Sequence, residues 1–182
     1  MIIGNKDKFG FELSKVSDSD HTCKLKLFVD SKNICEWKDS NGKVHKEIWW
    51  NLDELINYLH DTVDFIYDDD PFPVDDIAGE CASELDNNAR DFESENDEEM
   101  EDYYDSLDDW TYNHSWYHAR SGAVVPDVMF RKINNRIEVS WWNDQEDEGR
   151  FFTNKYGYAL IDCDYYRETI EALFDSYNNV WK

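Results

Sequence analysis

Residues 68–110 carry most of the net negative charge of this 182-residue chain, and that concentration limits how the segment can fold. They include 19 Asp and Glu residues but a single basic residue, Arg90, which gives a net charge of −18. The rest of the chain has 23 acidic and 17 basic residues, so the excess charge is local. Like charges one helical turn apart repel each other and destabilise an isolated helix. The segment therefore either solvates a surface or presents a negative field to a positively charged partner.

Within this segment, residues 91–110 have an apolar and an acidic face when they are placed on a helix. The apolar side chains recur mostly at spacings of three or four: Phe92, Met100, Tyr103, Leu107 and Trp110. A carboxylate stands at every fourth position: Glu93, Asp97, Glu101, Asp105 and Asp109. A helix rises about 1.5 Å per residue, and duplex DNA carries one charge per about 1.7 Å of its axis. The pattern predicts a helix that packs on the protein body and displays charge at a density similar to that of a phosphate backbone.

The first part of the chain predicts an antiparallel meander. Apolar and polar side chains alternate in residues 8–16 and 23–30, as in strands that bury one face. Asn41-Gly42 predicts a tight hairpin turn, and residues 43–49 follow it as the return strand. The first 50 residues are therefore expected to form one antiparallel unit.

A second meander is expected between residues 127 and 161. Asn134-Asn135 predicts the turn of a hairpin with strands before and after it, because Asn tolerates positive φ. Two short strands are expected further on, at residues 151–152 and 158–161.

Three to four helices are predicted around these strands. Residues 51–66 form the first, with Asn51 as its cap and one continuous apolar face. Residues 75–89 form the second, which begins with two aspartates that suit the positive end of a helix dipole. Residues 91–110 form the acidic helix, and Asp164 caps the last helix. The predicted fold class is α+β, an antiparallel sheet of two meanders with three to four helices, one strongly acidic.

The domain organisation follows from length and composition. Aromatic residues make up 16% of the chain, enough apolar surface to support an ordered core. We expect a single α+β domain over residues 1–182, with residues 68–110 as an acidic helical insert.

Cysteine spacing and the N-terminus bear on localisation. The four cysteines form no CxxC pair, so neither a zinc knuckle nor a redox motif is indicated. The N-terminal residues lack the apolar region of a signal peptide, and no apolar run approaches the length of a membrane span. We expect a protein of the bacterial host cytoplasm with reduced thiols and no direct membrane partner.

Motifs that carry catalysis are missing from the sequence. There is no GxGxxG, no GxxxxGK[ST], no GxSxG and no HExxH. His114 and His118 have a spacing that could place two imidazoles on one helix face, but no matched third ligand accompanies them. We therefore expect a binding protein and not an enzyme, with no catalytic residues, no metal site and no cofactor.

Paired tryptophans suggest a second kind of contact surface. Trp49-Trp50 and Trp141-Trp142 each place their two rings on opposite sides of an extended strand. One ring of each pair is expected in the core. The other is either covered by a helix or exposed as an anchor for a partner protein.

Two stretches carry a resemblance to known proteins. EIWWNLDELINYLHDTVDFIYDDDPFPV (residues 47–74) and HARSGAVVPDVMFRKINNRIEVSWW (residues 118–142) resemble a segment of phage-associated and mobile-element proteins. In those proteins the segment lies beside an ImmA/IrrE-type metallopeptidase domain, but no HExxH carries that activity here. The size and acidity of the chain are also similar to those of anti-CRISPR and anti-restriction inhibitors that mimic DNA. Both resemblances imply a role in conflict between phage or mobile elements and their host.

The expected function is inhibition by binding. The partner would be a basic nucleic-acid-binding protein, a host defence nuclease such as a type II CRISPR effector, whose groove the acidic helix blocks. Direct binding of nucleic acid is disfavoured by the charge. The contact residues are expected to be acidic side chains and one tyrosine of the insert: Asp91, Glu93, Asp97, Glu98, Glu101, Asp102, Tyr104, Asp105, Asp108 and Asp109. The alternative is an immunity protein that neutralises a bacterial toxin by capping its basic active site.

Overall fold

The computed structural model describes residues 1–16, 21–144 and 146–181 and confirms an α+β fold with antiparallel sheets. In these residues the first sheet contains β1 (Ile2–Asn5), β2 (Phe9–Lys15), β3 (Thr22–Val29), β4 (Lys32–Asn33) and β7 (Ile48–Asn51). The second contains β8 (Val128–Ile133), β9 (Arg136–Trp142) and β11 (Tyr156–Asp162). A small third sheet contains β5 (Trp37–Asp39), β6 (Val44–His45) and β10 (Arg150–Phe152). Each main strand predicted from alternation is present, but the return strand expected over residues 43–49 divides into β6 and β7. Because β5 and β6 pair with β10 in the third sheet, the first 50 residues do not form one antiparallel unit.

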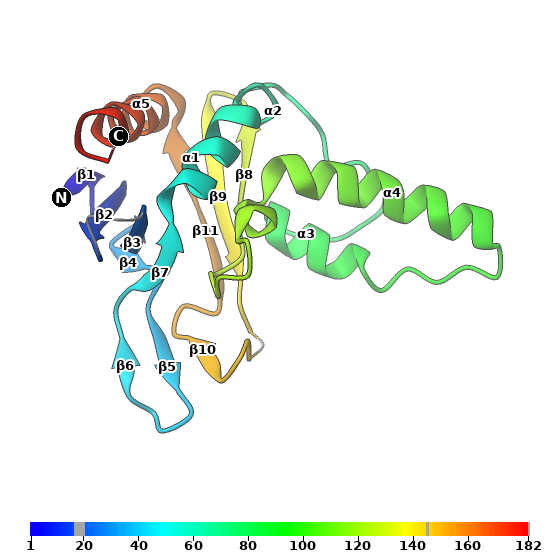
Figure 1. Ribbon diagram of the computed structural model, residues 1–182. Coiled ribbons are helices and arrows are strands. Elements are labelled where there is room, and N and C mark those ends of the chain that lie inside the picture. Colours follow the sequence, from blue (N-terminus) through cyan, green and yellow to red (C-terminus); the bar gives the residue numbers. More distant parts are fainter. Residues whose placement is uncertain (17–20, 145, 182) are drawn as a thin grey trace.

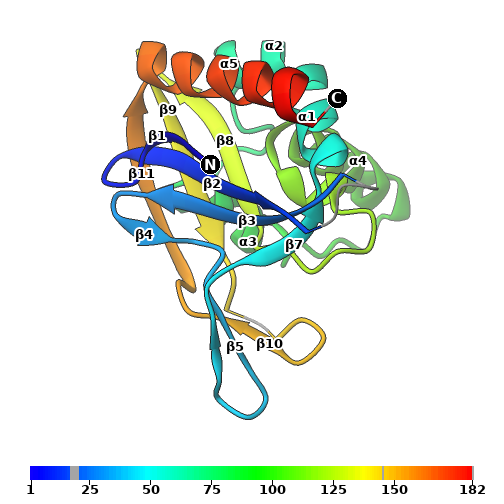
Figure 2. The ribbon, with the colours of Figure 1, turned by 60° about the vertical axis from the view of Figure 1, so that its left-hand side comes forward.

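Helices surround the sheets. They are α1 (Leu52–Asp61), α2 (Val63–Tyr67), α3 (Ala82–Ala89), α4 (Asp97–His114), the 3-10 turn η1 (Trp116–Ala119) and α5 (Cys163–Val180). The first sheet, the second sheet and the α3–α4 pair follow one another as layers, and the far end of α4 projects away from the body (Figure 1). The long helix α5 contacts β1 and β2 of the first sheet and β9 and β11 of the second, and it lies across one end of both (Figure 2).

The main core lies between the two larger sheets. Strand β3 alternates strictly, with Leu25 and Leu27 fully buried on the face toward the second sheet. From the second sheet, Phe130 and Trp141 join the same core and are also fully buried. Residues from both ends of the chain build this core, and burying this much apolar surface is the main favourable term in its folding.

The second sheet uses both of its faces. Strand β9 is its central strand, and Asn134, with a φ of 55°, forms the predicted turn from β8 into β9. Alternate residues of β9, such as Val139, enter the main core, while the polar Glu138 and Ser140 point to the other face, toward α3. This second face receives the acidic insert.

Outside the acidic helix, three predicted helix boundaries are wrong. The helix expected over residues 51–66 begins as predicted, with the Asn51 side chain accepting from the backbone N–H of Asp53 at 3.0 Å, but it divides at Thr62. The last helix is capped by Asp162, whose carboxylate accepts from the backbone N–H of Tyr165 at 3.1 Å. The helix follows β11 directly, so Asp164 already lies in its first turn.

The second predicted helix, over residues 75–89, is the third error, because α3 begins only at Ala82. Asp76 has a φ of 62°, which is incompatible with a right-handed helix at this point. Cys81 is also extended, with φ −146° and ψ 167°, so the helix cannot begin before the next residue.

Both tryptophan pairs divide as expected. Trp50 is 2% exposed and Trp49 is 56% exposed. Trp141 is fully buried, whereas Trp142 is half-buried and stacks on Tyr156 with ring centroids 5.4 Å apart. All four cysteines are free thiols in the interior.

Candidate binding surface of the acidic helical hairpin

The N-terminus of α3 is fixed to the second sheet by side chains of β9. The first backbone N–H groups of a helix have no partner within it. Here Ala82 N–H donates to the Glu138 carboxylate at 2.6 Å, and Ser83 N–H donates to Ser140 Oγ at 3.2 Å. Arg131 forms an ion pair with the same Glu138 at 3.0 Å and balances its buried charge. The start of α3 is therefore held by a polar network in the interior of the protein.

The C-terminal half of α4 is fixed by apolar packing. Leu107 and Trp110 are buried, and Trp110 meets the Phe72 ring edge-on with centroids 5.0 Å apart. Trp110 also joins Met129 of β8 in a small cluster on the outer face of the second sheet. These contacts hold one end of the helix against the body and leave the other end in solvent.

Helices α3 and α4 and the loop between them, residues 82–114, form the acidic hairpin. Aromatic contacts close its far end. Phe92 stacks on Tyr103 with ring centroids 4.0 Å apart and an interplanar angle of 16°. The Tyr103 hydroxyl donates to the Ala89 carbonyl at 2.9 Å. The Tyr104 hydroxyl lies 2.9 Å from the carbonyls of both Arg90 and Phe92. The loop between α3 and α4 is thus tied to the helix that follows it.

These contacts correct the predicted start of the acidic helix. It begins at Asp97, and Asn96 caps it by accepting from the backbone N–H of Glu98 at 3.2 Å. Because Phe92 must fold back onto Tyr103, residues 91–96 cannot continue the helix. Asp91 and Glu93 therefore lie in the preceding loop, and the every-fourth-residue series has four members on the helix instead of five.

Seven of the ten predicted contact residues lie on α4 with exposed side chains: Asp97, Glu98, Glu101, Asp102, Asp105, Asp108 and Asp109. The four of the regular series span about 18 Å of helix axis at 1.5 Å per residue, and they drift by about 40° per step around it. Tyr104 is half-buried, and its hydroxyl bonds backbone carbonyls of the loop before α4. It therefore stabilises the acidic surface, and less of its side chain is accessible to a partner.

Arg90, the one base of the insert, is engaged within it. Its guanidinium pairs with Asp86 at 3.0 Å and with Asp108, and Asp86 also accepts from the Thr111 hydroxyl at 3.0 Å. In the part of the chain that the structure describes, Asp108 is the only acid of α4 with an ion-pair partner. The remaining carboxylates of the helix face solvent without a nearby cation.

The histidine pair does not form a metal site. His114 ends α4, is fully buried, and stacks on Trp110, while its Nδ1 lies 2.8 Å from the Trp110 carbonyl. His118 lies beyond the break at Ser115, in η1, so the two imidazoles do not share a helix face. Burial lowers the pKa of His114. Across residues 1–16, 21–144 and 146–181, no three His, Cys, Asp or Glu side chains gather in a way that could hold a metal ion.

Two residues that build this surface escaped the sequence analysis, Arg90 and Glu138. Glu138 did carry a signal, since an acid in the middle of the apolar strand IEVSW needs a buried partner. The partner itself, a helix N-terminus 56 residues away in the chain, leaves no local trace. Arg90 stood out only as the one cation among the acids.

Comparisons with known proteins give no further identification. The chain matches no protein-family model, and searches of curated proteins and of solved structures found no significant similarity. The resemblances to mobile-element proteins and to DNA-mimicking inhibitors thus stay predictions. None of the helices described here has both the length and the apolar character needed to cross a membrane.

Proposed function

We propose that this protein inhibits a basic nucleic-acid-binding protein by presenting the acidic hairpin in place of a phosphate backbone. The best single candidate for the target is a host defence nuclease of the type II CRISPR class, met in the bacterial cytoplasm by a phage or mobile-element protein. The observation that carries the proposal is that the hairpin is fixed at both ends while its carboxylates stay exposed.

Fixing the hairpin matters for affinity. A disordered acidic tail would lose conformational entropy on binding, whereas a helix already held in place loses much less. The Glu138 cap and the Trp110 packing fix the base of the hairpin, and Phe92 and Tyr104 fix its tip. The charges can therefore enter a groove as a preformed unit.

The mechanism is electrostatic competition. Lys and Arg side chains of the target would bind the carboxylates of Asp97, Glu101 and Asp105 where they otherwise bind phosphates. The field of the insert steers the approach, and its effect falls with ionic strength because exposed charges are screened within about 8–10 Å at physiological salt. Inhibition should weaken as salt rises, and nucleic acid should compete with it.

The test compares two triple variants with equal charge change. Asp97→Asn, Glu101→Gln and Asp105→Asn together remove three charges from α4. Glu168→Gln, Glu171→Gln and Asp175→Asn remove three exposed charges from α5. DNA cleavage by a type II CRISPR effector is measured with each protein, over a salt series and with circular dichroism as the folding check.

We expect the α4 variant to lose inhibition at least tenfold and the α5 variant to keep it. Full inhibition by a folded α4 variant would overturn the mimicry. If the wild-type protein leaves the effector active but binds a small basic toxin, the protein is an immunity protein and the proposed inhibition of a nuclease is wrong.

A further inference from the structure

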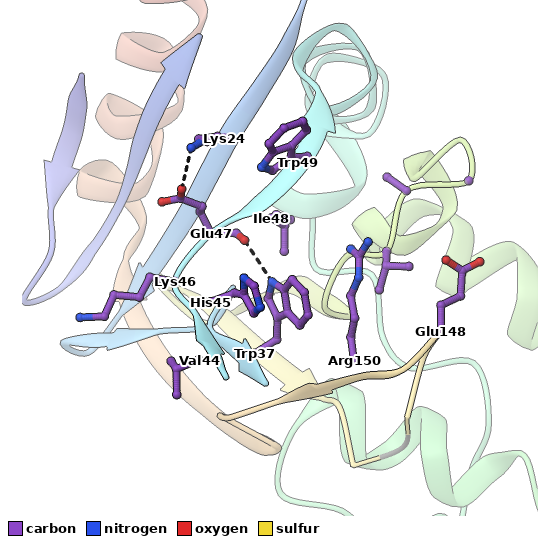
Figure 3. A pocket seen from close by; sticks show the side chains of 13 residues that line it. Lys24, Trp37, Val44, His45, Lys46, Glu47, Ile48, Trp49, Glu148 and Arg150 are labelled. Atoms are coloured by element: carbon purple, nitrogen blue, oxygen red, sulfur yellow. Dashed lines mark hydrogen bonds and ion pairs between the residues drawn. The ribbon is translucent and has the colours of Figure 1, made fainter. Parts of the chain in front are cut away.

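A groove of about 680 Å³ lies outside the acidic hairpin, between β6 and β7 on one side and residues 122–124 and β10 on the other (Figure 3). Its lining differs from the rest of this acidic protein. Basic and aromatic side chains gather in it, beside the two carboxylates of Glu47 and Glu148: Lys24, Lys46, Arg150, His45, Trp37 and Trp49. Ligand pockets commonly have volumes of about 300–1,000 Å³ and combine a few polar groups with apolar and aromatic walls.

One wall of the groove is a stack of three side chains built by the small third sheet. Trp37 on the central strand β5 pairs directly with His45 on β6, and their rings are 4.0 Å apart and nearly parallel, at 9°. On the other neighbouring strand, Arg150 places its guanidinium carbon 4.8 Å from the Trp37 ring centroid. Figure 3 shows Trp37 between His45 and Arg150. Trp37 Nε1–H donates to the Glu47 carbonyl at 3.1 Å, which fixes the middle of the stack.

Arg150 is held in position without a direct ion-pair partner among the described residues, although Glu148 lines the same groove. A tight turn with positive φ at Glu148 and Gly149 leads into β10, and the Arg150 side chain extends from this strand into the groove (Figure 3). No described carboxylate forms an ion pair with it, although the chain has 42 acidic residues. By contrast, Lys24 pairs with Glu47 at 3.1 Å. The guanidinium donors of Arg150 are therefore free for a ligand that offers paired acceptor oxygens.

Trp49 supplies a surface for stacking. Its ring is 56% exposed at the rim of the groove, while the neighbouring Ile48 is 1% exposed and forms part of the floor. The Lys24 ammonium lies 5.9 Å from the Trp49 ring centroid. An exposed indole ring offers an apolar face that a partner can cover, and nucleic-acid bases stack on such rings whatever their sequence.

We propose that this groove binds a mononucleotide, with its phosphate on the Arg150 guanidinium and its base stacked on Trp49. Bidentate pairing of Arg with phosphate is among the strong charge-assisted hydrogen bonds. A single nucleotide fits the chemistry better than a strand, because the net charge of −24 repels a long polyanion. This site is independent of the hairpin and of the inhibition proposed above.

Equilibrium dialysis at low salt, with the intact protein and each of AMP, GMP, CMP and UMP, tests the proposal. Adenosine, guanosine and inorganic phosphate are the comparison ligands. We expect at least one mononucleotide to bind with a Kd below about 1 mM, near −4 kcal/mol. The matching nucleoside and inorganic phosphate should each bind at least tenfold more weakly, since each keeps only half of the contacts.

Two variants and two controls assign the contacts. Arg150→Gln and Trp49→Leu should each weaken nucleotide binding at least tenfold. Arg167→Gln removes another arginine that lies over an aromatic ring, and Tyr156→Leu removes another exposed ring, and both should bind as wild type does. The proposal is overturned if no mononucleotide binds below that limit, if nucleoside or phosphate binds equally well, or if both groove variants bind normally. The α4 triple variant should bind nucleotide unchanged, which separates this site from the hairpin.

Discussion

The side-chain carboxylate of Glu138 accepts a hydrogen bond of 2.6 Å from the backbone N–H of Ala82, the first residue of α3. Glu138 is 1% exposed and lies on the central strand of the second sheet, so this bond joins the acidic insert to the interior of the protein. It uses the dipole of the helix as well as its free N–H, since a carboxylate is favoured at a helix N-terminus. The position of the exposed acids thus depends on a buried one.

Replacing Glu138 with Ala should therefore destabilise the protein strongly. The change leaves the Arg131 guanidinium buried without its partner and the Ala82 N–H without its acceptor. Removing one member of a buried ion pair typically costs about 3–5 kcal/mol. Urea unfolding followed by fluorescence measures the loss, with the exposed Glu168→Ala as the control that should change stability by less than about 0.5 kcal/mol. A loss below about 1 kcal/mol for Glu138→Ala would show that the bond does not support the fold.

Tyr104→Phe should loosen the tip of the hairpin and leave the body intact. The variant lacks the hydroxyl that bonds the carbonyls of Arg90 and Phe92, at a cost of about 1 kcal/mol. Hydrogen exchange of residues 90–96 should become faster, while exchange in β9 should not change. Tyr112→Phe on the same helix is the control, because Tyr112 is 62% exposed. Equal exchange rates in both variants would contradict the role given to Tyr104.

The buried carboxyl of Asp127 should make the free energy of unfolding depend on pH. Burial raises the pKa of its carboxyl to about 6 from the usual 3.8, although the Ser115 hydroxyl donates to it at 2.6 Å. Between these two values the folded protein keeps a proton that the unfolded chain has lost. The contribution of Asp127 to stability therefore falls as pH rises from about 4 to about 6, and stays low above that.

Asp127→Asn removes the free-energy cost of burying an ionised carboxylate and keeps an acceptor oxygen for the Ser115 hydroxyl. We expect the variant to be more stable than wild type at pH 8, by roughly 1–3 kcal/mol, with the difference vanishing near pH 4. Unfolding in urea at several pH values measures it, and the exposed Asp144→Asn serves as the control. A gain that is the same at pH 4 and pH 8 would exclude titration of Asp127 as its cause.

Local patterns predicted the parts of the fold that depend on neighbouring residues. Alternation located β2 and β3, and Asn134 formed the expected turn because Asn accepts positive φ. The Asn51 cap was also correct, since its acceptor lies two residues from the N–H that it binds. In each case the interacting groups lie within a few positions of one another in the chain.

Boundaries set by distant contacts could not be predicted in this way. The start of α3 is fixed by Glu138, and the start of α4 is fixed partly by the return of Phe92 onto Tyr103. The groove is a stronger case, because its stack joins Trp37 to Arg150 through a sheet pairing between the two ends of the chain. Composition predicted an acidic surface, but it could not show that a basic and aromatic groove lies on the same molecule.

The place of Arg90 in the hairpin leads to a prediction about salt. Arg90 links Asp86 to Asp108, and without it the two carboxylates add to the repulsion along the insert. Arg90→Gln should lower stability by about 1 kcal/mol at low salt, the usual scale for partly exposed ion pairs. Part of this loss should return at about 0.5 M salt, where the repulsion is screened within a few ångströms.

Thermal unfolding of wild type and variant at low and high salt measures this recovery. Arg167→Gln is a matched control, since it removes an arginine that pairs with Asp164 on α5, outside the strongly acidic segment. Salt should raise the melting temperature of Arg90→Gln more than that of the control, because the excess of carboxylates to be screened is much larger in the insert than on α5. An equal response of the two variants would mean that the carboxylates of α4 lie too far apart to repel each other, and they would then also be too dispersed to act together on a basic groove.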